Sequence, residues 1–114
     1  MSISIDDTIG VHARALTVRM HRSEILSANL ANESTPGYQA QDLDFTSAMR
    51  RLEQGQLSAQ ELMYRVPMQP SQDGNTVELS VEQAAFSRNS MDFQTSLTFL
   101  TMKFSGLKQA IEGR

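Results

Sequence analysis

The segment from Val81 to Glu112 constrains the fold of this chain more than any other part of its sequence. Its large side chains recur in alternating steps of four and three residues, which is the spacing of a coiled-coil seam. A helix over this range is about 48 Å long at about 1.5 Å per residue, the length of a coiled-coil arm rather than of a helix in a compact globule. Ser80 with Gln83 predicts a capping box at its start, and Gly113 predicts its end. The seam consists of Phe86, Ser90, Phe93, Leu97, Leu100, Phe104, Leu107 and Ile111.

A thinner seam of the same spacing predicts a second long helix, from Asp7 to Asn32. This helix should end there because Thr35, which precedes Pro36, is disfavoured in the α conformation. The two long helices are therefore expected to pair as an antiparallel coiled coil. The N-terminal seam consists of Ile9, Ala13, Leu16, Met20, Ser23, Ser27 and Leu30. A second stripe lies beside it and consists of Val11, Val18, Ile25 and Asn32.

A short helix is predicted between the two long ones. Asp44 is a good N-cap for it, and Gly55 is a good stop. Ser58 with Glu61 resembles another capping-box pair, but the prolines that follow exclude a long helix. The inward side chains of the short helix should be Phe45, Met49 and Leu52.

The rest of the segment from 33 to 80 is expected to be extended and irregular. Asp73-Gly74-Asn75 marks a turn, and the alternation over residues 76–79 predicts a short strand or hairpin arm. The fold class is thus mainly α, in a single domain over residues 1–114. Its parts are a helix over 7–32, a turn and extended middle over 33–80, and a helix over 81–112.

Composition excludes several classes of protein. A net charge of −3 without a basic arm argues against nucleic-acid binding. No apolar run approaches the roughly 18 residues that span a bilayer, so direct membrane insertion is not expected. The first twenty residues lack a basic start followed by an apolar stretch, so no cleaved signal peptide is expected. The absence of cysteine excludes disulfides and thiolate metal sites.

Candidate catalytic and metal-binding residues are few. His12 and His21 should lie on opposite faces of one helix, which favours two solvated histidines over a shared metal. Asp73-Gly74-Asn75 lacks the ligand spacing of a calcium loop, and Asp42 with Asp44 is better explained by helix capping than by acid–base catalysis. No nucleophile or phosphate-binding motif is present. We therefore expect no enzyme, no cofactor and no metal.

The two seams are thin for a pair of helices that must stand alone. Ser23 and Ser27 add little apolar area to the N-terminal seam, whereas ordering two long helices carries a large entropic cost. We therefore expect neighbouring chains to supply the missing apolar contact.

Residues 29–38, NLANESTPGY, closely resemble the N-x-A-N-x-x-T-P-G-Y signature of bacterial flagellar rod and hook proteins. The chain also resembles the proximal rod (FlgB) family within that superfamily, since it is short and lacks an inserted outer domain. Further points of resemblance are Tyr64-Arg65-Val66-Pro67, Gln69-Pro70-Ser71, Asp73-Gly74-Asn75-Thr76-Val77, Asn89 and Phe93-Gln94.

The resemblance implies a structural subunit of the proximal rod, which transmits torque from the rotor ring to the distal rod and hook. It implies several partners: further copies of the chain, other rod proteins, the rotor (MS) ring, a rod–ring adaptor protein, and the type III export apparatus during secretion. It also implies a periplasmic location in the flagellar basal body, reached without a cleaved signal peptide.

Individual residues receive expected roles. The amides of Asn29 and Asn32 should bridge to a neighbouring helix or satisfy carbonyls at the helix end. Pro36-Gly37 suits a type II turn that redirects the chain toward a segment in contact with other subunits. The candidate assembly residues are Asn29, Asn32, Thr35, Pro36, Gly37, Tyr38, Asn89, Phe93, Leu97, Leu100, Phe104 and Leu107.

A different class remains open. A small acidic coiled-coil adaptor or a type III secretion chaperone would share the composition and the seams, but it would act as a discrete dimer and would not need the Thr-Pro-Gly-Tyr corner.

Overall fold

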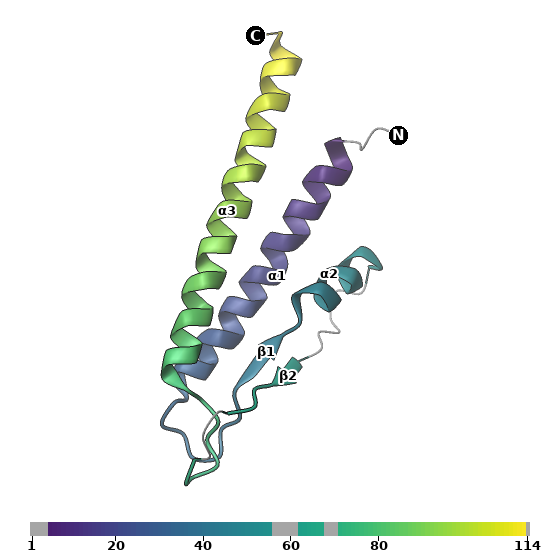
Figure 1. Ribbon diagram of the computed structural model, residues 1–114. Coiled ribbons are helices and arrows are strands. Elements are labelled where there is room, and N and C mark those ends of the chain that lie inside the picture. The colour runs from purple at the N-terminus through teal and green to yellow at the C-terminus, as the bar shows by residue number, and fades with distance from the viewer. Residues whose placement is uncertain (1–4, 56–61, 68–70, 114) are drawn as a thin grey trace.

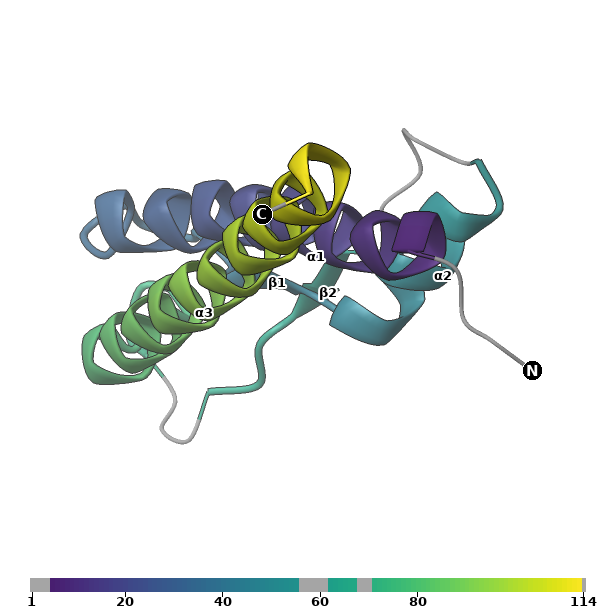
Figure 2. The same ribbon diagram turned by 90° about the horizontal axis from the view of Figure 1, so that it is seen from above.

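The computed structural model describes residues 5–55, 62–67 and 71–113 of the chain. The elements follow in the order α1 (Ile5–Ala31), β1 (Gln41–Leu43), α2 (Phe45–Glu53), β2 (Leu62–Tyr64) and α3 (Leu79–Glu112). Two long helices dominate an elongated molecule of 64 × 26 × 20 Å. Figure 1 shows α1 between α3 and the segment that contains α2 and the strands, and Figure 2 shows from above that the two long helices are inclined to each other.

The predicted long helices are confirmed, with ends that differ by two residues or fewer from the predicted ones. They pack side by side and antiparallel (Figure 1), as the fold prediction required. The capping box at Ser80 is wrong: α3 begins earlier, because the Glu82 N–H already bonds to the Glu78 carbonyl. At the other end Gly113 takes a left-handed conformation and ends the helix, as predicted.

The short helix α2 is confirmed. The Asp44 side chain accepts a hydrogen bond from the Thr46 N–H at 3.2 Å and caps the helix. Its inward side chains pack against the small core cluster of Val18, Leu43 and Ala48, and they are the predicted Phe45, Met49 and Leu52. The Ser58–Glu61 pair lies outside the described residues.

The strand prediction was correct in kind but wrong in place. The two strands are β1 and β2, which pair antiparallel with Gln41 opposite Tyr64 and Leu43 opposite Leu62. Residues 76–78 form no strand, because Thr76 bonds to residues 38 and 40 instead. Its N–H donates to the Tyr38 carbonyl, and its hydroxyl accepts from the Ala40 N–H. The turn at Gly74 is present, with φ of +79°.

The buried face of α1 differs from the predicted seam. The buried side chains are Ala15, Val18, Leu26 and Asn29, whereas Ala13, Met20 and Ser27 of the predicted seam are exposed. The reason is that α1 is covered from two sides, by α3 and by α2 with β1, so its buried stripe lies between the two. None of the helices in the described part of the chain is long and apolar enough to cross a membrane.

Candidate assembly site: the corner and its polar network

The corner, residues 32–38, begins where α1 ends. The Asn32 N–H bonds to the Ala28 carbonyl, and the Asn32 side-chain Nδ2 donates to the same oxygen at 2.7 Å. Asn32 Oδ1 then accepts from the Thr35 hydroxyl at 3.0 Å. Asn32 therefore satisfies a carbonyl at the helix end, which is one of the two roles predicted for the asparagines.

The turn at Pro36-Gly37 has the predicted type II geometry. The Tyr38 N–H bonds back to the Thr35 carbonyl at 3.2 Å, and Gly37, in the third position, has φ of +75°. The Gly37 N–H also bonds to the Asp73 carbonyl at 2.9 Å, so the corner is joined to the Asp73-Gly74-Asn75 turn. The two turns approach closely: a Cβ on Gly74 would lie 3.6 Å from the Gly37 Cα.

Asn75 holds the corner in place. Its buried Nδ2 lies 2.9 Å from the Asn32 carbonyl, 3.0 Å from that of Glu33 and 2.7 Å from that of Thr35. Its Oδ1 accepts from the Val77 N–H at 2.7 Å. Sequence reasoning treated Asn75 only as a turn residue, because nothing in the local pattern places it against carbonyls about 40 positions away.

Asn29 has the second predicted role, that of a bridge. Its fully buried Nδ2 donates to the Gln41 carbonyl at 2.7 Å and to Glu82 Oε2 at 2.8 Å. Its Oδ1 accepts from the Gln41 N–H at 3.0 Å and from the Tyr38 hydroxyl at 3.3 Å. The carboxamide thus pairs with both backbone groups of Gln41 as a neighbouring strand would, and it joins α1 to α3 within one chain.

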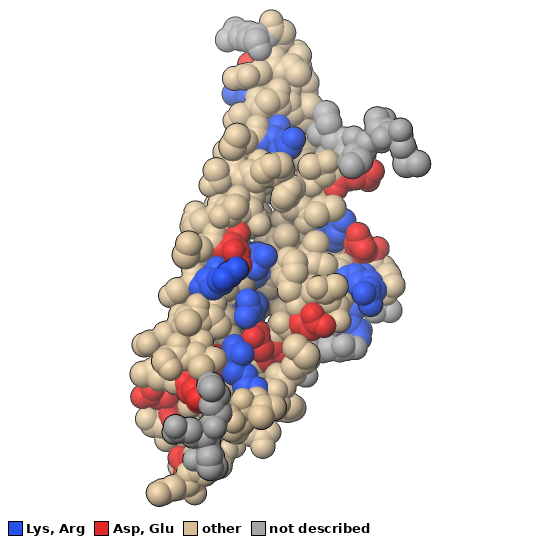
Figure 3. Space-filling view, in the orientation of Figure 1, with Lys and Arg blue, Asp and Glu red and all other residues tan. Residues whose placement is uncertain are grey.

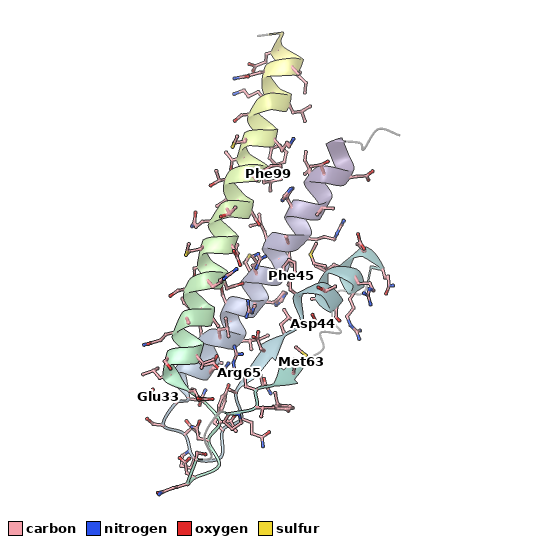
Figure 4. The ribbon with its side chains drawn as sticks, viewed as in Figure 1. Glu33, Asp44, Phe45, Met63, Arg65 and Phe99 are labelled. Carbon is pink, nitrogen blue, oxygen red and sulfur yellow. The ribbon has the colours of Figure 1, made fainter. Side chains whose placement is uncertain are left out.

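Two arginines and two carboxylates extend this bridge into a charge-balanced network. Arg65 Nε donates to Oε1 of the fully buried Glu82, and Arg65 donates to Asp42 Oδ2 at 3.0 Å. Arg22 binds Asp42 in bidentate fashion, at 2.9 and 3.0 Å. Figure 4 shows Arg65 beside the lower, paired ends of the long helices. We call this set of residues the polar network; it consists of Asn29, Arg22, Asp42, Arg65 and Glu82. It connects both long helices to β1, which contains Asp42, and to the end of β2, which Arg65 follows.

The electrostatics around Asp42 favour its charged form. Burial by itself would raise the pKa of Asp42. The hydrogen bonds from Arg22 and from the Leu43 N–H, together with the charges of Arg22 and Arg65, outweigh burial, so the pKa of Asp42 lies below its usual value. The hydrogen bond to Asp42 raises the pKa of Arg22 against the opposing effect of burial. The Arg22–Asp42 ion pair is therefore formed at neutral pH.

Asn89 lies at a second bridge between the long helices. Its fully buried Nδ2 donates to the Arg19 carbonyl at 2.9 Å and to the Ser23 hydroxyl at 2.8 Å. Arg19 itself lies 3.4 Å from Asp92 and stacks on the Phe45 ring at 4.3 Å. Asn89, predicted as an assembly residue, therefore holds α1 and α3 together inside one chain.

The structure separates the candidate residues into two groups. Asn29, Asn32, Thr35, Pro36, Gly37 and Tyr38 come together at the corner. The other predicted residues follow α3 away from the corner: Asn89 is buried, Phe93, Leu100 and Leu107 are half-buried, and Leu97 and Phe104 are exposed.

The histidines form no common site, and neither is fully solvated as predicted, because both are half-buried. His12 is half-buried and stacks on Phe99 with 4.3 Å between ring centroids. Figure 4 shows Phe99 on the side of α3 that faces α1. Among the described residues, no three histidine, aspartate or glutamate side chains gather in a way that could hold a metal ion.

The arrangement at the corner serves to fix the direction of the chain, since its polar groups are bound to one another.

Comparison with known proteins agrees with this arrangement. Residues 9–39 match a family model described as flagella basal body rod protein. The chain is 42% identical to the flagellar basal body rod protein FlgB of Aeromonas hydrophila, over 99% of this chain and 98% of the relative. It is 43% identical to FlgB of Cereibacter sphaeroides, over 94% and 95%, and 36% identical to FlgB of Salmonella typhimurium, over 96% of each. With its helix-ending corner locked as described and this identity over nearly its whole length, the chain belongs to the FlgB family of flagellar basal body rod proteins.

Proposed function

We propose that this chain is a structural subunit of the proximal rod of the bacterial flagellar basal body, where it transmits torque to the distal rod and hook. The observation that carries the proposal is the contrast between the two ends of the molecule. The corner end is held by buried polar contacts, centred on Asn29, Glu82 and Asn75. The other end leaves apolar side chains of α3 exposed, among them Phe104 and Ile111.

Such a contrast suits a part that is joined to others by its helices. A rigid corner holds the middle segment at a fixed angle to the helix pair, so that force applied to one is passed to the other. The exposed stripe of α3 needs apolar partners, and further copies of the chain or other rod proteins can supply them.

The proposal extends to location and partners. The subunit would be exported by the type III apparatus without a cleaved signal peptide, and it would assemble in the periplasm. There it would contact the rotor (MS) ring and a rod–ring adaptor protein. The family membership supports assembly with rod components; these particular contacts and the export route are part of the proposal.

Purified basal bodies provide the test. A strain that lacks the chromosomal copy and carries an epitope-tagged copy should swim, and the tag should be found at the proximal end of isolated rods. An untagged strain serves as the control for labelling. A tagged protein that stays in the cytoplasm as a dimer and binds export substrates there would contradict the proposal. It would favour the adaptor or chaperone.

A further inference from the structure

The apolar stripe of α3 does not point at α1. The residues of α3 that bind α1 through a hydrogen bond, an ion pair or a ring contact are Glu82, Asn89, Asp92 and Phe99. At 3.6 residues per turn, the centre of the stripe from Phe86 to Ile111 lies roughly 80° around the helix from the centre of those contacts. Helix α1 therefore covers one flank of the stripe and leaves the other flank open.

The open flank borders a groove between the two long helices. Its walls are apolar, since they are formed by Met20, which is 56% exposed, and by the ring of Phe93. Its remaining lining side chains are small or polar, which lets another helix approach closely, and Glu24 places an exposed carboxylate there. We call this surface the groove; it is lined by Met20, Ser23, Glu24, Ser90, Phe93 and Gln94.

The far end of α3 carries the matching surface. We call residues 100–112 of α3 the tip; Figure 1 shows that it extends beyond the N-terminal end of α1. Phe104 is 50% exposed and Ile111 is 77% exposed on one side of it. Lys108 lies on that same side, four residues after Phe104 and three before Ile111. Figure 3 shows few charged side chains over this end of the molecule.

We propose that the tip of one copy of the chain docks in the groove of a second copy. Phe104 and Ile111 would pack against Met20 and Phe93, and Lys108 would pair with Glu24. The inference rests on the proposed rod function and names the partner that covers this face.

Complementarity of charge and apolarity supports this choice of partner. Within the part of the chain that the structure describes, neither Lys108 nor Glu24 has an ion-pair partner. Each would gain one across the contact, beside apolar surfaces that both sides expose. A single contact of this kind leaves one tip and one groove free, so it can be repeated in the same direction to form a ring or an open helical series.

Cysteine crosslinking tests the contact directly, because the chain contains no cysteine. One preparation carries Met20→Cys and a second, differently tagged preparation carries Ile111→Cys. Mixed under mild oxidation at high concentration, they should form a disulfide-linked heterodimer. The matched control is Val11→Cys, which is also exposed but lies roughly 180° around α1 from Met20. We expect a roughly tenfold higher yield with position 20 than with position 11; equal yields would overturn the proposal.

Charge reversal adds a readout that does not depend on cysteine reactivity. Lys108→Glu in the tip preparation should lower the yield several-fold, and Glu24→Lys in the groove preparation should restore it. The crosslink should form again in basal bodies isolated from cells that produce both variants. If position 20 crosslinks there only to another rod protein, the choice of occupant is wrong although the rod function stands. If the chain is absent from basal bodies, the rod function itself fails, whatever the crosslink in solution.

Discussion

The side-chain amide of Asn29 donates a hydrogen bond to the carboxylate of Glu82 across 2.8 Å, between residues that are 53 positions apart in the sequence. Both side chains are fully buried. Asn29 lies in the last turns of α1 and Glu82 in the first turn of α3, so the contact joins the ends of the two long helices where the chain leaves one and enters the other.

Removal of the Glu82 carboxylate should destabilise the protein strongly. Glu82→Ala leaves Arg65 with one carboxylate instead of two and removes an acceptor of Asn29. Loss of one partner from a buried ion pair typically costs about 3 kcal/mol or more. Urea denaturation should record that loss, whereas the exposed Glu33→Ala should change the free energy of unfolding by less than about 0.5 kcal/mol. Similar values for both variants would mean that the polar network adds no stability.

A carboxylate at position 29 should be tolerated poorly at neutral pH and better in acid. Asn29→Asp keeps the shape of the side chain but places a second buried carboxylate against Glu82, and two like charges at this distance repel each other. As the pH falls, protonation of the introduced carboxyl group relieves the repulsion. The loss in free energy of unfolding relative to wild type should therefore shrink between pH 7 and pH 5.

Asn29→Ala is the control for that variant, because it removes the donor to Glu82 without adding a charge. Its cost should change little over the same pH range. If the loss in free energy of unfolding for Asn29→Asp does not depend on pH, then the lost donor, and not the added charge, destabilises the variant.

Asp42 gives a pH dependence of the wild-type protein, in a lower pH range. Because its pKa in the folded protein is below the usual value of 3.8, its contribution to stability is fully present above that value and is lost as the pH falls through the lower, folded pKa. The difference in free energy of unfolding between wild type and Asp42→Asn should therefore be constant from pH 7 to pH 5. It should decrease only below about pH 4. A decrease that is already complete at pH 5 would contradict the lowered pKa.

Much of the fold could be predicted because its signals are local. The spacing of apolar residues and the position of Pro36 predicted both long helices, and the roles of Asn32 and Gly37 depend on neighbours within a few residues. The strand predicted at residues 76–79 was wrong, because an alternating pattern does not show which backbone groups lie close enough to pair. Thr76 bonds to Tyr38 and Ala40 instead, and the helix begins directly afterwards.

Contacts between distant residues could not be predicted in the same way. A periodic pattern states which side chains share a helix face but not which element covers that face, so Met20 and Phe104 were placed in a seam and proved to be exposed. Arg65 and Glu82 are single charged residues 17 positions apart, and nothing near either residue signals that they meet. The residues of the corner and Asn29 were thus named from the sequence, whereas the four charged residues of the polar network were missed.

Asn75 should be essential for the order of the corner. Asn75→Ala removes the donor that faces the carbonyls of Asn32, Glu33 and Thr35, and each hydrogen bond lost costs about 0.5–1.5 kcal/mol. The effect should be local: amide exchange should accelerate at Gly37 and Tyr38 and stay unchanged at Val18 in the core. Ser71→Ala, at an exposed position before the same turn, is the control. Unchanged amide exchange at the corner in Asn75→Ala would show that other contacts hold the corner in place.

The last prediction concerns Gly37, whose φ of +75° penalises any residue with a Cβ. No other atom lies within 4 Å of the place a Cβ would take, so the cost is one of backbone conformation alone. It should be about 1 kcal/mol for Gly37→Ala, larger for the β-branched Gly37→Val and smallest for Gly37→Asn. Denaturation of the three isolated variants gives the order.

Gly55 is the matched control for function. Its φ is +78° and its surroundings are equally open, but it follows α2 and is not part of the corner. Gly37→Val and Gly55→Val should therefore lose similar stability. Because only the first redirects the chain between the helix pair and the middle segment, cells with Gly37→Val should export the subunit and build few rods, while cells with Gly55→Val should swim nearly normally. Equal motility of the two strains at equal stability would show that the direction set by the corner does not matter for assembly.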